Sequence, residues 1–439
     1  MTVISVVGGT GSLTDGLGLG ATDDVIVGPN GYVTGVNGDG LVFENSSSHF
    51  ALIAGYVVGT DDAIELRGQC RDIVILIGES GTVSGNFGIW GFEDDAMHVT
   101  NHGTVLANQV GILATGSGAQ VVNYGTVTAM RGVAVELGTR TDTPGDETRL
   151  INFGTVSGGS HAVRGDIDFG DVVRNFGTLQ GLVELLGGND KVLNHGLVAG
   201  DVDLGDGNDS YDGRDGTVTS LVRGGLGNDV FFGNSVGRDH FDGGAGIDTL
   251  NFSNGPAVRV ALDLSFSNNG AAFGDTYSGF ENVRGSDRDD AIRGNSAANL
   301  LYGAGGNDSL SGQNGADTLS GGTGIDTLSG GAGNDTFKLA ALTEIGDRIL
   351  DFHNIAGDND RFMIDASAFG GGLATGTLAG SAFLARTDNL AQDGDDRFIF
   401  RTTDTTLWFD ADGSGAGAAV LVADLQAGAA LTAADIVLI

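Results

Sequence analysis

The stretch that most constrains the fold is residues 303–338, where one nine-residue pattern occurs four times in a single frame. The units read GAGGNDSLS, GQNGADTLS, GGTGIDTLS and GGAGNDTFK. Each has glycines in its first half, Asp at the sixth place and an apolar residue at the eighth. These residues are Asp308, Asp317, Asp326 and Asp335, and Leu310, Leu319, Leu328 and Phe337. A flexible linker has no reason to keep Asp and Leu in frame, so the spacing predicts a repeated structural unit.

Each unit is predicted to be a tight turn followed by a short strand. The Gly-rich part turns and aims its carbonyls inward, because Gly adopts positive φ without steric cost. The last three residues form a strand with one apolar side chain pointing inward. Two units make a coil of eighteen residues, so Asp308 stacks with Asp326 on one edge and Asp317 with Asp335 on the other. Adjacent turns then supply the roughly six to eight oxygens that a hard cation needs.

This nonapeptide is similar to the calcium-binding repeat of RTX proteins, and the resemblance implies a β-roll that binds Ca²⁺. One block covers 204–251, with LGDGNDSYD, GGLGNDVFF and GGAGIDTLN, and a second covers 285–338. Residues 252–284 are an insertion in which VRVALDLSF alternates like a strand. The expected metal-binding residues are Asp209, Gly225, Gly227, Asp229, Asp239, Gly244, Gly246, Asp248, Asp290, Gly306, Asp308, Gly315, Asp317, Gly322, Gly324, Asp326, Gly331, Gly333 and Asp335.

Two units of the second block are degenerate. GSDRDDAIR and GNSAANLLY keep the frame but lose glycines, and Asn299 replaces Asp. Their ion sites are expected to be weaker or absent, although Asp290 is placed to pair with Asp308. GGND at 187–190 resembles a partial unit, with Asp190, so the roll is expected to begin without a linker after the preceding coil.

Residues 31–200 carry a longer repeat, with motifs such as GTVSG at 81, GTVLA at 103 and GTVTA at 125. From Gly81 the spacings are 22, 22, 29, 23 and 19 residues. Two β-rich segments in each repeat predict the rungs of a parallel β-helix, and the pattern resembles the coiled passengers of bacterial surface adhesins. A β-sandwich is disfavoured because sandwich strands do not repeat in phase. One Asn precedes each repeat Gly by two residues and is predicted to form a buried amide ladder: Asn101, Asn123, Asn152, Asn175 and Asn194.

Residues 341–439 leave the nine-residue frame. DRILDFHNIAGDNDRFMID, DDRFIFRTTDTTLWFDADGSG and LTAADIVLI resemble the C-terminal region of RTX proteins, which implies an uncleaved signal read by a type I secretion machinery. The N-terminal MTVISVVGGTGSLTDG lacks the features of a secretory signal peptide. The expected organisation is an all-β chain: a parallel β-helix over 1–200, a calcium-binding β-roll over 201–340, and a β-rich secretion region over 341–439.

The charge balance narrows the partners. Asp and Glu total 57 against 21 Lys and Arg, a formal net charge of −36. This argues against nucleic acid and anionic membranes as partners, and it predicts that divalent cations belong to the native state. A single cysteine, Cys70, excludes an internal disulfide. No apolar run approaches the roughly 18 residues of a membrane span.

No catalytic motif stands out. HExxH is absent, and no serine has the context of a nucleophile elbow. Glu93, Asp94 and Asp95 suggest acid–base work on a polysaccharide, but acidic turns occur throughout the chain. The basic residues of the first coil are few and scattered: Arg67, Arg71, Arg131, Arg140, Arg149, Arg164 and Arg174.

The sequence therefore favours a secreted, extracellular calcium-binding protein that is not an enzyme. Its expected role is structural or adhesive at the bacterial cell surface. Its expected partners are calcium ions, the type I secretion machinery, and either further copies of itself, assembled into filaments or a surface layer, or a cell-surface polysaccharide. The alternative is a secreted polysaccharide lyase or epimerase that uses the β-helix as its catalytic module.

Overall fold

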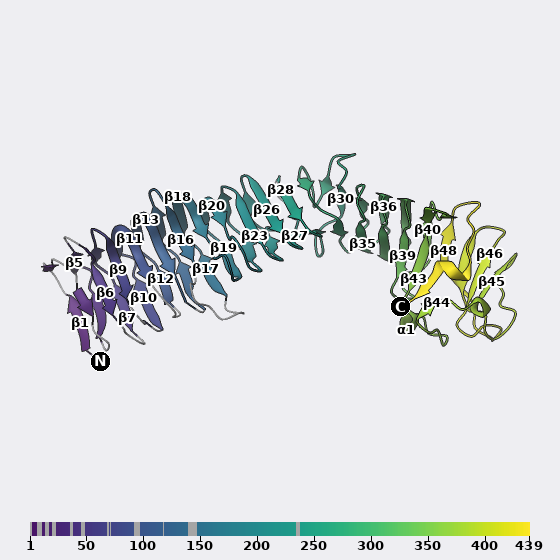
Figure 1. Ribbon diagram of the computed structural model, residues 1–439, viewed down its shortest axis with the longest axis horizontal. Coiled ribbons are helices and arrows are strands. Elements are labelled where there is room, and N and C mark those ends of the chain that lie inside the picture. The colour runs from purple at the N-terminus through teal and green to yellow at the C-terminus, as the bar shows by residue number, and fades with distance from the viewer. Residues whose placement is uncertain are drawn as a thin grey trace. The chain divides into compact units, whose positions relative to one another are not determined.

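The computed structural model (Figure 1) describes residues 2–6, 11–13, 17–19, 23–35, 38–44, 49–67, 70, 72–91, 97–116, 118–138, 147–233 and 238–439, the first two segments by their backbone alone. Nearly all regular elements are strands, so the predicted all-β class is confirmed. The chain divides into two compact units, residues 1–231 with 239–246, and residues 232–238 with 247–439. Among the described residues, no helix is long and apolar enough to span a membrane. Glu93, Asp94 and Asp95 lie outside the described residues.

The first unit is a parallel β-helix, as predicted, in which successive rungs stack strand on strand (Figure 1). Valines of the repeat motif lie in one register, with Val83 beside Val105 and Val105 beside Val127. The prediction of two strands in each rung was wrong, because a third strand precedes the ladder Asn. In that strand every second side chain is apolar and buried, as at Ile73 and Ile75, so it closes a third face of the coil.

The strands of the three faces follow the chain in order. The first face holds β1 (Thr2–Val6), β4 (Asp23–Val27), β7 (Phe50–Ile53), β10 (Ile73–Ile77), β12 (Met97–Asn101), β14 (Gln120–Asn123), β17 (Thr148–Asn152), β19 (Asp171–Asn175), β21 (Lys191–Asn194) and β24 (Ser210–Asp212). The second holds β2 (Gly11–Leu13), β5 (Tyr32–Gly35), β8 (Tyr56–Val58), β15 (Thr126–Ala129), β22 (Leu197–Ala199) and β25 (Thr217–Val218). The third holds β3 (Leu17–Leu19), β6 (Leu41–Glu44), β9 (Asp62–Arg67), β16 (Val133–Leu137), β23 (Val202–Asp206), β26 (Leu221–Leu226) and β28 (His240–Ala245). Four long strands serve the second and third faces together: β11 (Thr82–Gly91), β13 (Thr104–Ala114), β18 (Thr155–Arg164) and β20 (Thr178–Glu184).

The five asparagines form the predicted ladder at one corner of the coil. Each is fully buried. The Nδ2 of each donates to the Oδ1 of the next, at 2.8, 2.8, 2.9 and 2.9 Å from Asn101 to Asn194. Because a buried amide without partners is costly, this chain of bonds holds the rungs in one register.

A stack of rings runs beside the ladder. The residue after each ladder Asn carries a planar ring, and the rings are those of His102, Tyr124, Phe153, Phe176 and His195. Their centroids are 4.6, 4.9, 5.0 and 5.1 Å apart, and neighbouring planes differ by 5 to 12°. Tyr124, Phe153 and Phe176 are each more than 40% exposed. Since the planes are nearly parallel, the stack turns ring edges toward solvent.

The second unit contains the predicted two-faced β-roll. On one face Leu301, Leu319 and Phe337 stand in register, and on the other Leu310 stands beside Leu328. These apolar side chains are all buried. The prediction that two nine-residue units make one coil is therefore confirmed for the intact repeats.

The insertion and the C-terminal region extend this β-structure. The predicted strand in VRVALDLSF forms only over β30 (Val258–Ala261), which pairs in parallel with β34. It ends before Leu264, where φ is 56°. Beyond residue 340, β40 continues the face of β38, and β43 continues that of β39. The last strand, β49, lies beside β43.

The remaining elements belong to this unit, with β27 (Val230–Phe232) at its boundary. One face of the roll holds β29 (Thr249–Asn251), β33 (Asn282–Arg284), β35 (Leu300–Gly305), β37 (Thr318–Thr323), β39 (Thr336–Leu339), β43 (Arg361–Ile364), β44 (Gly376–Thr377) and β49 (Ile436–Leu438). The other holds β30, β31 (Asn269–Gly270), β34 (Ala291–Arg293), β36 (Ser309–Asn314), β38 (Thr327–Ala332), β40 (Asp347–Ile349), β45 (Phe383–Arg386), β46 (Phe398–Arg401), β47 (Thr406–Phe409) and β48 (Val420–Leu425). Short elements complete it: β32 (Thr276–Ser278), β41 (Asn354–Ile355), β42 (Asp358–Asn359), α1 (Ala366–Phe369), η1 (Gly380–Ala382) and η2 (Ala433–Asp435).

Candidate metal sites of the repeats

The repeat aspartates form columns in which each turn binds the next. The backbone N–H of Asp308 donates to Oδ1 of Asp326 at 2.7 Å, and that of Asp326 donates to Oδ1 of Asp347 at 2.9 Å. On the opposite edge Asp317 donates in the same way to Asp335, at 2.8 Å, and Asp335 to Asp360, at 2.9 Å. The predicted stacking of aspartates eighteen residues apart is thus present in the structure.

A similar column runs through the first unit. The N–H of Asp190 donates to Oδ1 of Asp209 at 2.7 Å, and the N–H of Asp209 donates to Oδ1 of Asp229 at 2.8 Å. Asp190 is buried, as are Asp229, Asp239 and Asp248. The column therefore begins at the partial unit GGND.

The second carboxylate oxygen of these aspartates is buried and accepts no hydrogen bond from the described part of the chain. This holds for Oδ2 of Asp190, Asp209, Asp308, Asp317, Asp326, Asp335 and Asp347. Burying a charged oxygen without a donor costs free energy, which a cation beside it offsets. The orphaned oxygens therefore mark places where positive charge is required.

The pKa values of these carboxyl groups express the same need. Burial, and next to it the charge of neighbouring aspartates, raises the pKa of Asp308, Asp317 and Asp347 to about 7. For Asp190 the same causes raise the pKa to about 9. A bound cation favours the ionised form and reverses such shifts.

Glycines make room for the carboxylates and for the turn carbonyls. A Cβ at Gly321 would lie 2.0 Å from Oδ2 of Asp326. A Cβ at Gly315 would meet the carbonyl oxygen of Ala297 at 2.5 Å and Oδ1 of Asp317 at 3.1 Å. Carbonyl and carboxylate oxygens thus converge on one turn, and oxygen donors of these two kinds are what calcium binds.

The predicted turn glycines all adopt positive φ. Their φ angles range from 97° at Gly322 to 146° at Gly246, which side chains with a Cβ rarely adopt. The set comprises Gly225, Gly227, Gly244, Gly246, Gly306, Gly315, Gly322, Gly324, Gly331 and Gly333.

The two degenerate units supply protein donors instead. Oδ2 of Asp290 accepts from the N–H of Ser286 at 2.6 Å and from its hydroxyl at 3.1 Å. Oδ1 of Asn299 accepts from the N–H of Asn295 at 2.8 Å, and its amide donates to the carbonyl of Glu281. In both units the protein fills the position that a cation would take in an intact unit. Asp290 nevertheless donates its own N–H to Asp308, at 2.7 Å.

Sequence reasoning missed Asp347 and Asp360, which extend the two columns beyond residue 338. They follow Asp326 and Asp335 by 21 and 25 residues, not by eighteen. One signal was present, because each stands two residues before a buried apolar residue, Ile349 or Phe362, as the repeat aspartates do.

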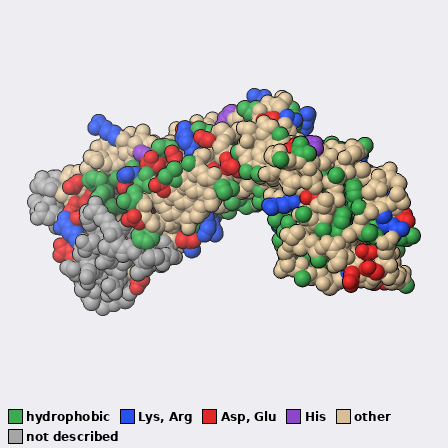
Figure 2. All heavy atoms as spheres, turned by 45° about the vertical axis from the view of Figure 1, so that its right-hand side comes forward, with side chains coloured by type: hydrophobic (Ala, Val, Ile, Leu, Met, Phe, Trp, Pro, Cys, Tyr) green, Lys and Arg blue, Asp and Glu red, His purple; other side chains and the backbone are tan. Residues whose placement is uncertain are grey.

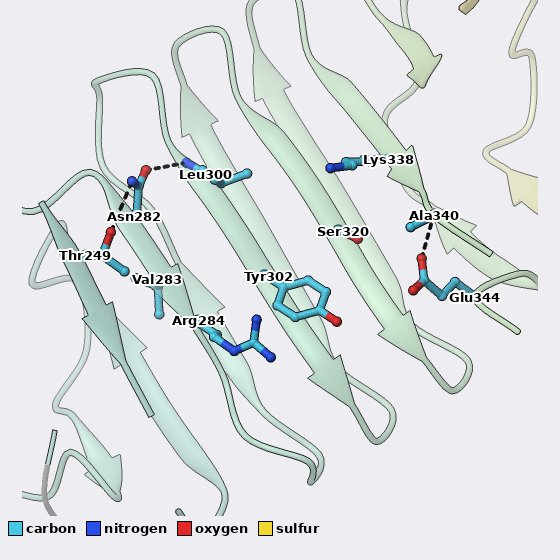
Figure 3. Close-up of a pocket in the computed structure, with 10 residues that line it drawn as sticks. All are labelled: Thr249, Asn282, Val283, Arg284, Leu300, Tyr302, Ser320, Lys338, Ala340 and Glu344. Carbon is cyan, nitrogen blue, oxygen red and sulfur yellow. Dashed lines mark hydrogen bonds between the residues drawn. The ribbon is translucent and has the colours of Figure 1, made fainter. Parts of the chain in front are cut away.

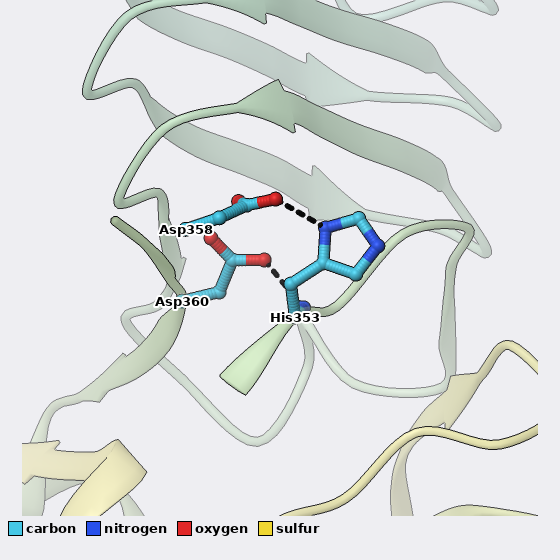
Figure 4. Close-up of side chains that lie close together, drawn as sticks. All are labelled: His353, Asp358 and Asp360. Atoms are coloured by element: carbon cyan, nitrogen blue, oxygen red, sulfur yellow. Dashed lines mark hydrogen bonds and ion pairs between the residues drawn. The ribbon is translucent and has the colours of Figure 1, made fainter. Parts of the chain in front are cut away.

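His353 joins the end of one column (Figure 4). Its Nδ1 lies 2.9 Å from Oδ2 of Asp358, and its N–H donates to Oδ2 of Asp360 at 2.7 Å. Burial raises the pKa of Asp360 to about 6. Because both oxygens of Asp360 accept backbone hydrogen bonds, from His353 and from Asp335, this group closes the column with protein donors.

A separate groove of about 440 Å³ lies over the strands of one face of the roll (Figure 3). Arg284 and Lys338 bring two cations to it against one carboxylate, Glu344. The guanidinium of Arg284 lies 4.7 Å from the ring centroid of Tyr302. Its other lining residues are Thr249, Asn282, Val283, Leu300, Ser320 and Ala340. Cations, hydroxyls and an amide together suit an anionic, hydroxyl-rich ligand.

The stacked coils, the columns of buried carboxylates and the glycine turns define a calcium-binding β-roll. The model of the RTX calcium-binding nonapeptide repeat matches the chain four times, at residues 221–250, 275–310, 284–319 and 311–339. This chain therefore belongs to the proteins that carry RTX repeats, and its repeats bind calcium.

One similar solved structure is the solution structure of the AlgE6R3 subunit from the mannuronan C5-epimerase of Azotobacter vinelandii. The two sequences are 35% identical over 34% of this chain and 78% of that chain, with a TM-score of 0.23. No curated protein matches this chain.

Proposed function

We propose that this RTX protein is secreted and acts outside the cell as a non-catalytic structural or adhesive protein of the bacterial surface. The observation that carries the proposal is the set of buried carboxylate oxygens without donors in the repeats. Such a roll is stable only with calcium bound, and extracellular calcium modules typically bind with dissociation constants of about 10⁻⁴–10⁻³ M. The roll would then stay unfolded inside the cell and fold after export.

The proposed calcium ligands are the repeat aspartates and the carbonyls of the glycine turns. The carboxylates of the intact units are those of Asp209, Asp229, Asp239, Asp248, Asp308, Asp317, Asp326 and Asp335, to which the structure leads us to add Asp190 and Asp347. Asp290 is proposed as a weaker ligand, because Ser286 already donates to it. The proposed division is a β-helix over 1–200, the roll over 201–340, and a secretion region over 341–439.

Export by a type I machinery is part of the proposal, and burial of the chain's last strand supports a link between export and folding. Ile436 and Leu438 of β49 are buried in the sheet beside β43. Asp435 accepts hydrogen bonds from Thr432 and from Asn354. An exporter can read these residues only while the roll is unfolded, as it is expected to be at low calcium.

Deleting residues 380–439 is expected to abolish export, since the deletion removes the proposed signal. The test is to express the full and shortened chains with a type I exporter and to measure the protein in cells and medium. Asp287→Ala, a substitution of an exposed residue, serves as the control that leaves the signal intact. Undiminished export of the shortened chain would refute the type I route.

The groove supports an adhesive role toward an acidic polysaccharide. Arg284 and Lys338 stand out because acidic residues exceed basic ones almost threefold in this chain. On the face that Figure 2 shows, basic side chains are few and spaced apart, which supports the non-catalytic part of the proposal. Self-association through the free edge of the first strands is proposed as a second means of building a surface layer, and light scattering of the purified protein in millimolar calcium tests it.

Replacing both groove cations, Arg284→Gln with Lys338→Gln, is expected to weaken binding of a uronic-acid polysaccharide by about tenfold or more, because each lost charge-assisted contact is worth about 1.5–3 kcal/mol. Binding is measured in calcium by isothermal titration. The pair Arg348→Gln with Arg361→Gln, which lies outside the groove lining, removes the same charge and should bind almost as the parent does. Equal losses in the two double variants would mean that net charge, not the groove, governs binding.

A further inference from the structure

Three carboxylates of the β-helix converge outside the repeats. Oxygen atoms of Asp39, Asp62 and Glu65 all lie within 4.8 Å of one another. Asp62 and Glu65 belong to β9, and Asp39 lies two residues before β6 on the preceding rung. Leu41 stands beside Ile64, so Asp39 and Asp62 occupy matching positions on neighbouring rungs. The N–H of Asp62 donates to Oδ1 of Asp39 at 3.2 Å.

One guanidinium serves these three carboxylates. Nη2 of Arg67 lies 2.6 Å from Oδ2 of Asp39 and 2.6 Å from Oε2 of Glu65. Asp62 is only 8% exposed, and its Oδ1 accepts no hydrogen bond from any described residue. The group thus holds a buried, unpartnered carboxylate oxygen beside two further carboxylates, and two negative charges remain without compensation.

The charges that face Asp62 act in the same sense. Burial, followed by the charges of Glu65, Asp39 and Asp61, raises the pKa of Asp62 to about 7, and Arg67 offsets this only in part. Burial also raises the pKa of Glu65. The arrangement thus favours either protons or a cation near Asp62, and geometry decides between them.

We propose that Asp39, Asp62 and Glu65 bind one hard divalent cation, Ca²⁺ or Mg²⁺, at a site of the β-helix separate from the nonapeptide repeats. Donor chemistry favours a hard ion, because every converging atom is a carboxylate oxygen. Its two charges would balance the two that Arg67 leaves over. An ion there ties the rung of β6 to the rung of β9.

Trp90 provides a selective probe for this site. In β11 it stands directly beside Glu65, and the chain has only one other tryptophan, Trp408. In full-length protein carrying Trp408→Phe, excitation of tryptophan reports terbium bound near Trp90 and not terbium in the repeats. We expect saturable terbium emission that millimolar Ca²⁺ or Mg²⁺ displaces, and the more effective competitor identifies the ion.

The variant Asp62→Asn in that background should weaken terbium binding by about tenfold or more, whereas Asp61→Asn, an exposed neighbour of equal charge, should not. Far-UV circular dichroism in calcium checks that each variant is folded. Equal terbium affinity in folded Asp62→Asn and parent would overturn the proposal. If Asp62→Asn does not fold, the parent titration decides, since absence of saturable emission, or emission that neither ion displaces, overturns it as well.

Discussion

Removing calcium from the full-length chain is expected to unfold the repeats while the β-helix before them keeps its strands. Each buried carboxylate oxygen left without a partner costs about 1–3 kcal/mol or more. Seven such oxygens lie in the columns, at Asp190, Asp209, Asp308, Asp317, Asp326, Asp335 and Asp347. Their combined cost approaches or exceeds the roughly 5–15 kcal/mol by which a domain is stable. The β-helix, in contrast, is held by neutral amide bonds such as that from Asn123 to Asn152.

Hydrogen exchange with and without chelator measures this directly. Protection should disappear over residues 300–364 and remain over residues 97–114. Repeats that stay protected in excess chelator would contradict the calcium dependence. Acid should act in the opposite sense to chelator. Because burial raises the pKa of Asp308 and Asp317 from 3.8 to about 7, the folded roll binds more protons than the unfolded chain between these values. In chelator, the roll should therefore lose stability as pH rises from about 5 to about 8.

Asp326→Ala is expected to impair calcium binding and stability far more than Asp287→Ala. Asp326 is fully buried, its Oδ1 accepts the N–H of Asp308 at 2.7 Å, and its Oδ2 is one of the orphaned oxygens. The substitution removes a ligand and leaves a buried N–H without an acceptor, a loss of about 2–4 kcal/mol. Asp287 is exposed, and its replacement should change stability by less than about 0.5 kcal/mol.

Calcium titration followed by circular dichroism, together with thermal unfolding in saturating calcium, measures both variants. Asp326→Asn separates the two effects, because it keeps the Oδ1 acceptor while removing the charge. It should retain more stability than Asp326→Ala but bind calcium little better. Identical calcium midpoints for Asp326→Ala and Asp287→Ala would refute the assignment of the sixth place of each unit as the ligand position.

The sequence predicted most reliably what a constant spacing controls. Eighteen residues separate Asp308 from Asp326 and Asp317 from Asp335, and this interval alone predicts the two columns. The interval lengthens to 21 and 25 residues at Asp347 and Asp360, so the frame no longer reveals them, although the local pattern persists. In the β-helix, the in-phase asparagines predicted the ladder for the same reason.

What the sequence did not predict depends on contacts between rungs of unequal length. The third strand of each rung has no repeated motif of its own and becomes visible only through burial, as at Ile73 and Ile75. The convergence of Asp39 with Asp62 likewise requires the register of β6 on β9. A motif that recurs can be recognised from letters alone, but a contact that occurs once requires coordinates.

The ring stack shows which dimension of the β-helix is fixed. Between Tyr124 and Phe153 the chain takes 29 residues, and between Phe176 and His195 it takes 19, yet the ring separations are 4.9 and 5.1 Å. The corner therefore acts as a ruler that measures the axial period and ignores the contour length of each rung. Extra residues, such as those after Gly138, leave the coil sideways without changing its pitch. The scaffold can consequently gain or lose loops during evolution while every later rung stays in phase.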